Sequence, residues 1–596
     1  MCTRRWRPWI ANTVLLTLLL AVNAKAVAQD RPAESRLKTT VATDGVVAKF
    51  VTEYTADGST LNRRFRMPTD PIGYEFRDRH FEQWRERLQS LDFDALGLDD
   101  RIDWVALQAE IEHDQSEMLR LRERQQFAKL LVPYTDWILQ VCATREHGVT
   151  LPAEEIAALL DRVQLEANRL AKRPADALAN GGRDAAIDPI VALEASDLID
   201  GLLRILADTH RFLDGYDPAY TWWSAKSNEA ARNALTAHRK AIREKLGGLN
   251  EADNDKIVGV PIGDEALREH LRHAWIAYSP EELIRIGEQE MAWCDREFAK
   301  AATELGLDGD WKKALDQVKS LHVEPGDQPR LIRELAWEAI HFLEAHDLVT
   351  VPDLAKHGWR IEMMSPEAQR MNPYFLGGEN IIVAFPTNGM THAERLMSLR
   401  SNNIHFCRAT VHHELIPGHH LQYYSNSRFR SYREAFRTPF WTEGWALYWE
   451  MLLWDLNFHQ SPEDRIGMLF WRRHRAARIL FSLNYQTGRW TPEQCVQYLI
   501  ERVGHEPSAA AAEVRRSFMG SYGPLYQAAY LLGGLQIRKL HEEFVQSGKM
   551  TNREFHDAIL RENHLPIELL RYKLTGTPPQ KNAAPTWKFY TFEDKR

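Results

Sequence analysis

The segment from Val411 to Leu421 reads VHHELIPGHHL, and the segment from Phe440 to Glu450 reads FWTEGWALYWE. A His-Glu pair, further histidines within one or two helical turns and a glutamate on a following helix are the ligands of a catalytic zinc site. In such a site two imidazoles and one carboxylate bind the metal, and a fourth position stays open for water. The two segments therefore predict metal-assisted hydrolysis, with the rest of the chain as the scaffold around them.

The spacing of the histidines departs from the common pattern His-Glu-x-x-His, which puts both histidines on one helix face. Pro417 stands four residues after His413, and Gly418 follows it. Because proline cannot donate a backbone hydrogen bond, we expect the helix to be widened or broken here, which would carry His419 to the second ligand position. On an unbroken helix the rival, His420, would lie roughly 10 Å along the axis from His413. The sequence therefore favours His413 and His419.

The same residues also have a purely structural interpretation. The histidines would then be ordinary residues of a helix surface or core, and Glu443 would be a buried, hydrogen-bonded carboxylate. Four histidines and a glutamate within nine positions favour the metal site.

The strings HELIPGHHLQ and TEGWALYWE resemble the bacterial domain-of-unknown-function 885 family, whose members carry His-Glu-x-x-Pro-Gly-His and then Glu-Gly-Trp-Ala. The likeness extends to LDDRIDWVALQAEIEHD near Leu98 and IGDEALREHLRHAWIAYSPEELIRIGEQE near Ile262. That family is similar to the gluzincin metallopeptidases. The resemblance implies a helical peptidase-like fold with a zinc ion, Zn²⁺. It also implies a set of site residues, with Glu414 as general base and His413, His419 and Glu443 as ligands.

Two residues near the C-terminus are further candidates, Tyr530 from the resemblance and Arg516 from its side-chain chemistry. Tyr530 matches the tyrosine of the family segment Pro-Gly-Gln-Ala-x-x-Tyr, so its hydroxyl is a candidate donor to a developing oxyanion, or else a core residue. Arg516 would bind a substrate carboxylate or form a structural ion pair. Where many relatives read Asp-Thr-Gly-Ile-His, this chain has Ser482 to Gln486, SLNYQ, which puts substrate specificity or catalytic strength in doubt.

The first 28 residues have the order of a secretory signal peptide. Arg4, Arg5 and Arg7 precede an apolar run, and a small-residue pattern ends at Ala28, before Gln29. The run is shorter than the roughly 20 residues of a membrane span, so we expect no stable membrane anchor after cleavage. We therefore expect an exported protein that is either periplasmic or secreted.

The 596 residues, 44% of them hydrophobic and 27% charged, have the composition of a globular protein. Loss of the four basic residues of the signal peptide moves the formal net charge from −8 to −12, which argues against nucleic acid as a partner. The remaining cysteines are far apart in sequence, so they form neither a zinc knuckle nor a dense disulfide scaffold. Bridges and buried thiols both stay open for Cys142, Cys294, Cys407 and Cys495.

Apolar residues recur at helical spacing in five early segments: 81–91, 104–124, 152–171, 192–213 and 228–246. Later helices are predicted to start after Ser279, Thr438, Ser461 and Thr491, each followed by a proline. The best strand signal is NIIVAF, residues 380–385, interpreted either as an edge strand that pairs with substrate or as a buried core strand.

We therefore expect a mainly α, bilobal, metallopeptidase-like fold with a small edge sheet beside the zinc helix. Residues 29–330 would form an N-terminal helical lobe, and residues 331–596 a catalytic lobe. The expected function is zinc-dependent hydrolysis of short or unfolded peptides, with Glu414 as base. The alternatives are a zinc hydrolase of non-peptide amides or esters, and a peptide-binding relative of weakened activity.

Overall fold

The computed structural model describes residues 45–67, 70–146, 148–149, 151–173, 189–249, 256–369, 372, 374–519 and 522–592. The expected signal peptide lies outside these residues. The chain from Asp44 onward forms one compact unit. A boundary between two lobes at residue 330 stays a prediction.

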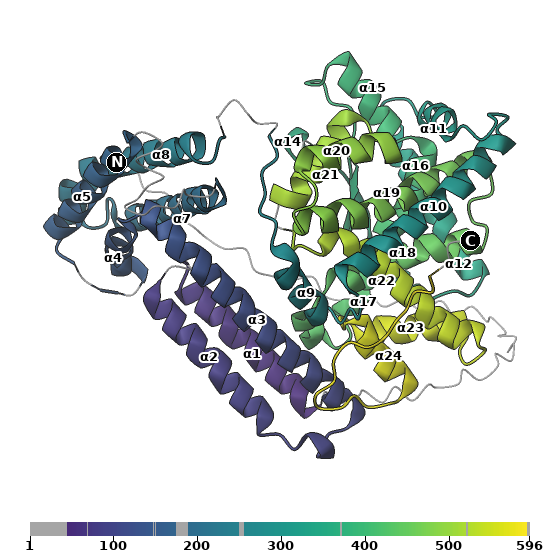
Figure 1. The fold of residues 1–596 in the computed structure, drawn as a ribbon, viewed down its shortest axis with the longest axis horizontal. Helices are drawn as coiled ribbons and strands as arrows, with labels where there is room; N and C mark the ends of the chain where they lie inside the picture. The colour runs from purple at the N-terminus through teal and green to yellow at the C-terminus, as the bar shows by residue number, and fades with distance from the viewer. Residues whose placement is uncertain are drawn as a thin grey trace, which may run out of the picture. The chain divides into compact units, whose positions relative to one another are not determined.

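The described part of the chain is mainly helical, as predicted. In the first part, α1, α2 and α3 pack side by side (Figure 1) around one apolar cluster. The helices α4, α5, α7 and α8 surround a second cluster. The bounds of these elements are α1 Val46–Arg64, α2 Pro71–Gln89, the short 3₁₀ helix η1 Phe93–Ala95, α3 Leu98–Leu131, α4 Thr135–Glu146, α5 Ala153–Ala171, α7 Pro189–Leu213 and α8 Pro218–Lys245.

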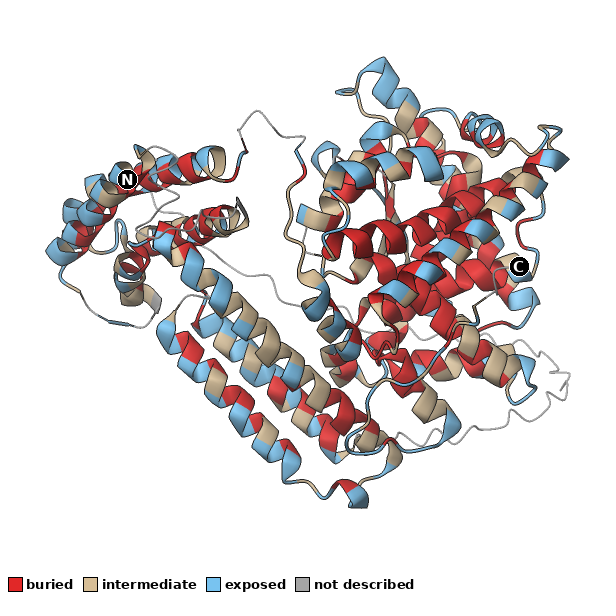
Figure 2. Ribbon diagram, viewed as in Figure 1, coloured by how far each residue is buried: buried red, intermediate tan, exposed pale blue. Residues whose placement is uncertain are grey.

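Most of the remaining helices contribute to the largest apolar cluster, which fills the space around α16, α18, α19 and α22 (Figure 2). The helices before the motif are α9 Gly263–His273, α10 Pro280–Glu304, α11 Trp311–Lys319, α12 Gln328–Ala345, α13 Asp353–Gly358, α14 Pro366–Gln369 and α15 His392–Ser401. The motif helices are α16 Ile404–Glu414, α17 His419–Asn426, η2 Ser431–Phe436 and α18 Pro439–Asp455. The last helices are α19 Pro462–Gln486, α20 Pro492–Tyr498, η3 Leu499–Val503, α21 Pro507–Met519, α22 Tyr526–His541, η4 Glu542–Gln546, α23 Asn552–Glu562 and α24 Ile567–Thr575.

The predicted helix starts are confirmed. Ser279, Ser461 and Thr491 each accept a hydrogen bond from the backbone N–H three residues on, and a proline occupies the first turn. Thr438 caps α18 in the same way. Local sequence therefore fixes where the helix that carries Glu443 begins.

The sheet has three strands in the order β1-β3-β2. These are β1 Arg360–Met363, β2 Phe375–Leu376 and β3 Asn380–Val383, with β1 parallel and β2 antiparallel to β3. The predicted strand exists as β3, but its interpretation as an edge strand is wrong. Because both sides of β3 are already paired, its backbone has no ladder left for a substrate. The strand nearer the motif is the edge strand β2, which packs on α16.

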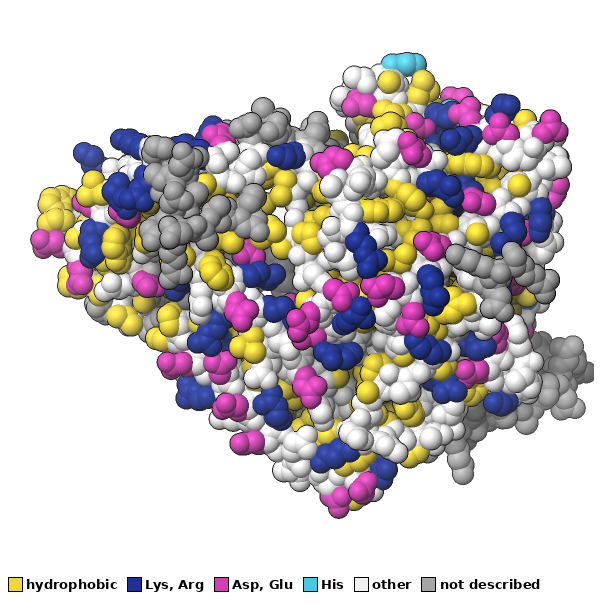
Figure 3. Space-filling view, in the orientation of Figure 1, with side chains coloured by type: hydrophobic (Ala, Val, Ile, Leu, Met, Phe, Trp, Pro, Cys, Tyr) yellow, Lys and Arg dark blue, Asp and Glu magenta, His cyan; other side chains and the backbone are white. Residues whose placement is uncertain are grey.

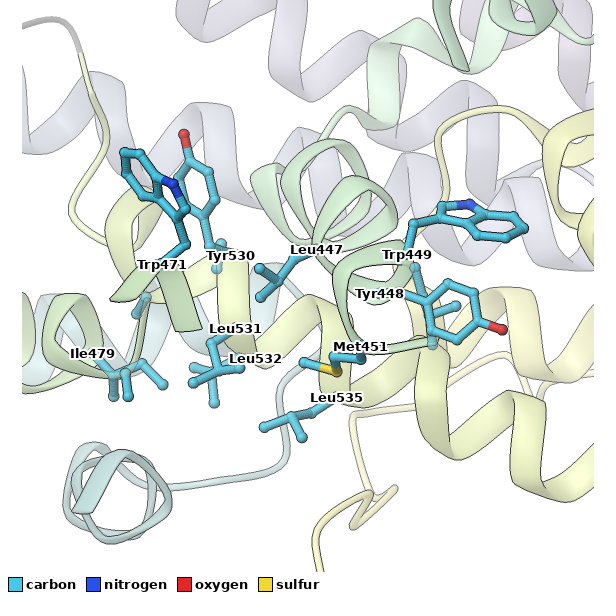
Figure 4. Packing of buried hydrophobic residues seen from close by; sticks show 14 of the residues in the cluster. Leu447, Tyr448, Trp449, Met451, Trp471, Ile479, Tyr530, Leu531, Leu532 and Leu535 are labelled. Carbon is cyan, nitrogen blue, oxygen red and sulfur yellow. The ribbon is translucent and has the colours of Figure 1, made fainter. Parts of the chain in front are cut away.

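Two glycine positions bring α18 and α22 into close contact. A Cβ built on Gly444 would lie 2.6 Å from the Cα of Gly533, and one built on Gly533 would overlap the carbonyl oxygen of Phe440. Only helices without side chains at the crossing can approach this closely. Beyond the crossing, large apolar side chains of α18, α19 and α22 interdigitate (Figure 4): Leu447, Met451, Ile479, Leu531, Leu532 and Leu535.

Acidic and basic side chains are interspersed over the face shown in Figure 3. Among the described residues, no helix combines the length and the apolar character that a membrane span requires. The four described cysteines, Cys142, Cys294, Cys407 and Cys495, are all buried free thiols.

Candidate metal centre

The HELIPGH segment breaks the helix, as expected from Pro417. Helix α16 ends at Glu414 and α17 begins at His419, and the Ile416–Pro417 peptide bond between them is cis. Gly418 donates a backbone hydrogen bond to the carbonyl of His412 at 3.0 Å. A Cβ on Gly418 would overlap the carbonyl oxygen of His413, so the tight connection requires glycine. Trp445 Nε1 donates to the Pro417 carbonyl at 2.8 Å and ties the break to α18.

The break brings together three predicted ligands. His413 and His419 stand with their rings nearly perpendicular, at a centroid separation of 4.9 Å. Glu443 Oε2 lies 3.7 Å from His413 Nε2 and 3.3 Å from His419 Nε2. All three residues are buried, and one ligand atom of each lies within 4.8 Å of the others.

This arrangement fits a zinc ion. Tetrahedral zinc with bonds of about 2.0–2.1 Å places its ligand atoms about 3.3 Å apart, close to the spacing found here. Glu443 Oε2 is buried and has no hydrogen-bond partner among the described residues, which is costly for a carboxylate unless a cation occupies the space beside it. Burial alone would lower the pKa of His413, yet Glu443 and Glu450 raise it to about 9. The cluster therefore attracts positive charge, from a proton or from a metal.

His420 does not join the cluster. Its ring nitrogens Nδ1 and Nε2 face the backbone carbonyls of Gly378 and Ala355 at 3.2 and 3.0 Å. The broken helix turns it to the opposite side from His419.

Glu450, seven residues after Glu443 on α18, contacts the other nitrogen of His413. Its Oε1 lies 2.7 Å from His413 Nδ1, and Arg475 Nη2 lies 3.5 Å from the same oxygen. A carboxylate at Nδ1 holds the ring orientation and leaves Nε2 free for a metal. The two glutamates of α18 thus have different places: Glu443 is a candidate ligand, and Glu450 is a partner of another candidate ligand, His413.

Glu414 lies beside the cluster at the wall of a cavity of about 150 Å³. Its carboxylate packs so closely on the connection after β2 that a Cβ on Gly377 would overlap Glu414 Oε2. Burial holds the pKa of Glu414 above its usual range. A buried carboxylate of raised pKa next to a metal site suits a general base.

Two tyrosines of α22 line the same cavity. The Tyr526 hydroxyl donates to Glu443 Oε1, which orients the carboxylate. Tyr530 stacks on His413 with ring centroids 6.2 Å apart. Sequence reasoning singled out Tyr530 and missed Tyr526, although a tyrosine four residues earlier on the same helix faces the same side.

Three arginines also line the cavity, Arg475 and Arg478 of α19 and Arg516 of α21. Only Arg516 was considered from the sequence, because nothing local marks the other two within α19. Gln486, in the segment that departs from the family pattern, accepts a hydrogen bond from the backbone of Ile262 at 3.1 Å. It is not among the described residues that line the cavity.

A second group of possible ligands, His113, Glu117 and His270, lies between α3 and α9 and is half-buried. Its carboxylate is already engaged, because Arg120 pairs with Glu117 and His270 Nε2 lies 3.1 Å from it. A guanidinium at this place opposes a cation, so the group is a weaker candidate than the buried one.

The model of a family described as "Bacterial protein of unknown function (DUF885)" matches residues 56–574. No curated protein matches the chain. A solved structure from Shewanella oneidensis is described as a "putative lipoprotein of unknown function". It is 16% identical in sequence, with a TM-score of 0.65, and the match covers 89% of this chain and 100% of that chain. A "putative lipoprotein" from Colwellia psychrerythraea is 18% identical, with a TM-score of 0.49, over 73% of this chain and 77% of that chain. At such low identity, the likeness to the Shewanella structure concerns the fold alone.

Proposed function

The chain belongs to the DUF885 family of bacterial proteins of unknown function, and from the buried cluster at its centre we propose that it is a zinc-dependent peptidase. The observation that carries this proposal is the meeting of His413, His419 and Glu443 within 4.8 Å, where Glu443 Oε2 is buried and has no hydrogen-bond partner among the described residues. Two imidazoles and a carboxylate beside a second, buried glutamate form the donor set of a hydrolytic zinc site.

His413, His419 and Glu443 would hold the zinc ion, which would act as a Lewis acid that polarises a carbonyl and lowers the pKa of a water molecule. Glu414 takes a proton from the attacking water and passes it to the leaving nitrogen. The hydroxyl of Tyr530, at the cavity wall, donates a hydrogen bond to the carbonyl oxygen as negative charge develops there. Tyr526 and Glu450 hold Glu443 and His413 in place.

The size of the cavity supports short or unfolded peptides as substrates. A volume of about 150 Å³ corresponds to roughly five water molecules, so a folded protein does not fit. The edge strand β2 contributes Phe375 and Leu376 to the wall and is the strand next to which an extended peptide can lie.

The decisive experiment uses the purified mature chain, its metal content and a peptide library incubated with and without chelator. Cleavage that is lost on chelation and restored by zinc supports the proposal, whereas stoichiometric zinc without any cleavage rules out the peptidase. Glu414→Gln is expected to keep its zinc while turnover falls by roughly a hundredfold or more, because it lacks only the basic oxygen. Glu443→Ala is expected to lose zinc and activity together, and the exposed Glu501→Gln serves as the control.

We also propose that the protein is exported. The order of charged, apolar and small residues before Gln29 supports this, as does the description of the Shewanella protein as a "putative lipoprotein". Mass spectrometry of periplasmic or secreted material should find a new N-terminus near Gln29. An intact Met1 in a membrane fraction would contradict export.

A further inference from the structure

The three arginines that line the cavity beside the metal cluster form an arginine wall that is almost fully enclosed by protein. The side chains of Arg475, Arg478 and Arg516 are 6%, 3% and 13% exposed. All three line the same cavity as His413 and Glu443. Burying a guanidinium is expensive unless its charge and its N–H groups are matched by partners.

These three arginines have fewer carboxylate partners than guanidinium groups. Arg478 and Arg516 share one carboxylate, that of Glu513, at 2.7 and 2.9 Å. Arg475 has Glu450, at 3.5 Å, and that carboxylate also contacts His413. Among the described residues, Arg478 Nη1 and Arg475 Nε are buried without a hydrogen-bond partner. The arginine wall therefore has unused donors.

The charges point the same way. The three guanidinium groups carry three positive charges, and the carboxylates paired with them, Glu450 and Glu513, carry two negative ones. One positive charge is left over in a buried space, and His474, which packs near Glu513, is neutral because burial holds its pKa well below its usual range. A single carboxylate from a ligand would complete the balance, and the planar fork of arginine suits that group.

The distance from the metal cluster to the arginine wall limits the length of the ligand. The ring of Tyr530 lies 6.2 Å from the ring of His413 and 4.8 and 4.3 Å from the guanidinium carbons of Arg475 and Arg478. Both guanidinium groups thus lie within about 11 Å of the His413 ring. Because consecutive Cα atoms are about 3.8 Å apart, one or two residues span the gap between a carbonyl at the metal cluster and a carboxylate at the arginines.

We propose that Arg475, Arg478 and Arg516 bind the free C-terminal carboxylate of a short peptide, which is cut one or two residues from that end. This inference rests on the proposed peptidase function and names its substrate class. In it, Arg516 has the carboxylate-binding role that sequence reasoning had left open beside a structural ion pair.

The test compares N-acetylated pentapeptides, varied at their last two positions and made once as free acids and once as C-terminal amides. The acids should lose their last one or two residues, and the amides should react at least about tenfold more slowly, since a buried charge-assisted contact is absent. Equal rates for acids and amides, or cuts in the middle of the acids, would overturn the inference and leave the peptidase function standing.

If neither set is cleaved, the peptidase function fails, and the arginine wall is then tested separately by calorimetry on the zinc-loaded protein. The probe is N-acetylphenylalanine as free acid and as amide. Tighter binding of the acid supports the carboxylate site, and equal binding or none refutes it.

Variants of Arg516 test the wall with the least disturbance, because Glu513 keeps Arg478 as a partner. Arg516→Gln should lower kcat/KM for the acids by roughly 10- to 100-fold and leave the amides nearly unchanged, so the acid-to-amide ratio collapses. Arg516→Lys should recover part of that ratio. Arg489→Gln removes an exposed guanidinium paired with Glu281 and should change neither rate. A structural role alone would lower both rates together, and the thermal unfolding of each variant shows whether it folds.

Discussion

Replacement of Glu450 by glutamine tests whether this residue supports a ligand or is itself one. Glu450 Oε1 lies 2.7 Å from His413 Nδ1, and the two side chains are 1% and 2% exposed. Glutamine keeps an oxygen that accepts the imidazole N–H but loses the negative charge. Because a charge-assisted hydrogen bond is roughly twice as strong as a neutral one, the imidazole becomes a poorer ligand.

The expected effect is a 10- to 100-fold loss of zinc affinity, or about 1.4–2.8 kcal/mol. We expect a loss at the upper end of this range, because Arg475, at 3.5 Å from the same oxygen, would then lack a carboxylate partner. Its uncompensated positive charge would oppose zinc binding. Glu443→Ala removes a candidate ligand, so its loss of zinc affinity should be far larger than that of Glu450→Gln.

Zinc affinity is measured by competition with a chelating dye, together with the metal content of the purified protein. Glu562→Gln, at a buried glutamate paired with Arg433 and with no residue of the cluster, controls for the general effect of removing a buried charge. An unchanged zinc affinity in Glu450→Gln would refute the supporting role. A loss as complete as that of Glu443→Ala would make Glu450 a direct ligand.

Three further outcomes are expected. Gly418→Ala should unfold or lose its zinc, because its Cβ overlaps a carbonyl oxygen, and the expected destabilisation is about 3 kcal/mol or more. Gly389→Ala has open space around its Cβ and should show the same thermal unfolding as the wild type. His419→Ala should remove most of the zinc and His420→Ala should leave it largely bound, and the reverse result in a metal assay would exchange the two ligands. Burial raises the pKa of Glu110 from 4.5 to about 8, so the folded protein keeps a proton that the unfolded chain has lost, and stability should fall as the pH rises through this window. Denaturant unfolding at pH 5 and 8 should show a smaller fall in Glu110→Gln, and an equal fall would contradict the assignment.

The sequence by itself predicted the helical class, the starts of four late helices and the broken helix at Pro417. These features follow from short-range rules, namely helical periodicity, capping hydroxyls and the missing N–H of proline. The choice of His413, His419 and Glu443 as a set also came from the sequence. The structure brings their ligand atoms together, and zinc binding by them stays a prediction.

The tertiary structure alone decided which residues surround that set. Tyr526 contacts Glu443 across 83 positions of sequence, and Arg478 meets Glu513 across 35, because α18, α19, α21 and α22 pack around one cavity. The close crossing of Gly444 and Gly533 sets part of that packing, and no periodicity in either helix indicates it. The position of β3 in the sheet was likewise open in the sequence, because a short apolar run such as NIIVAF reads the same at an edge as in the centre. Only the pairing with β1 and β2 placed it in the middle.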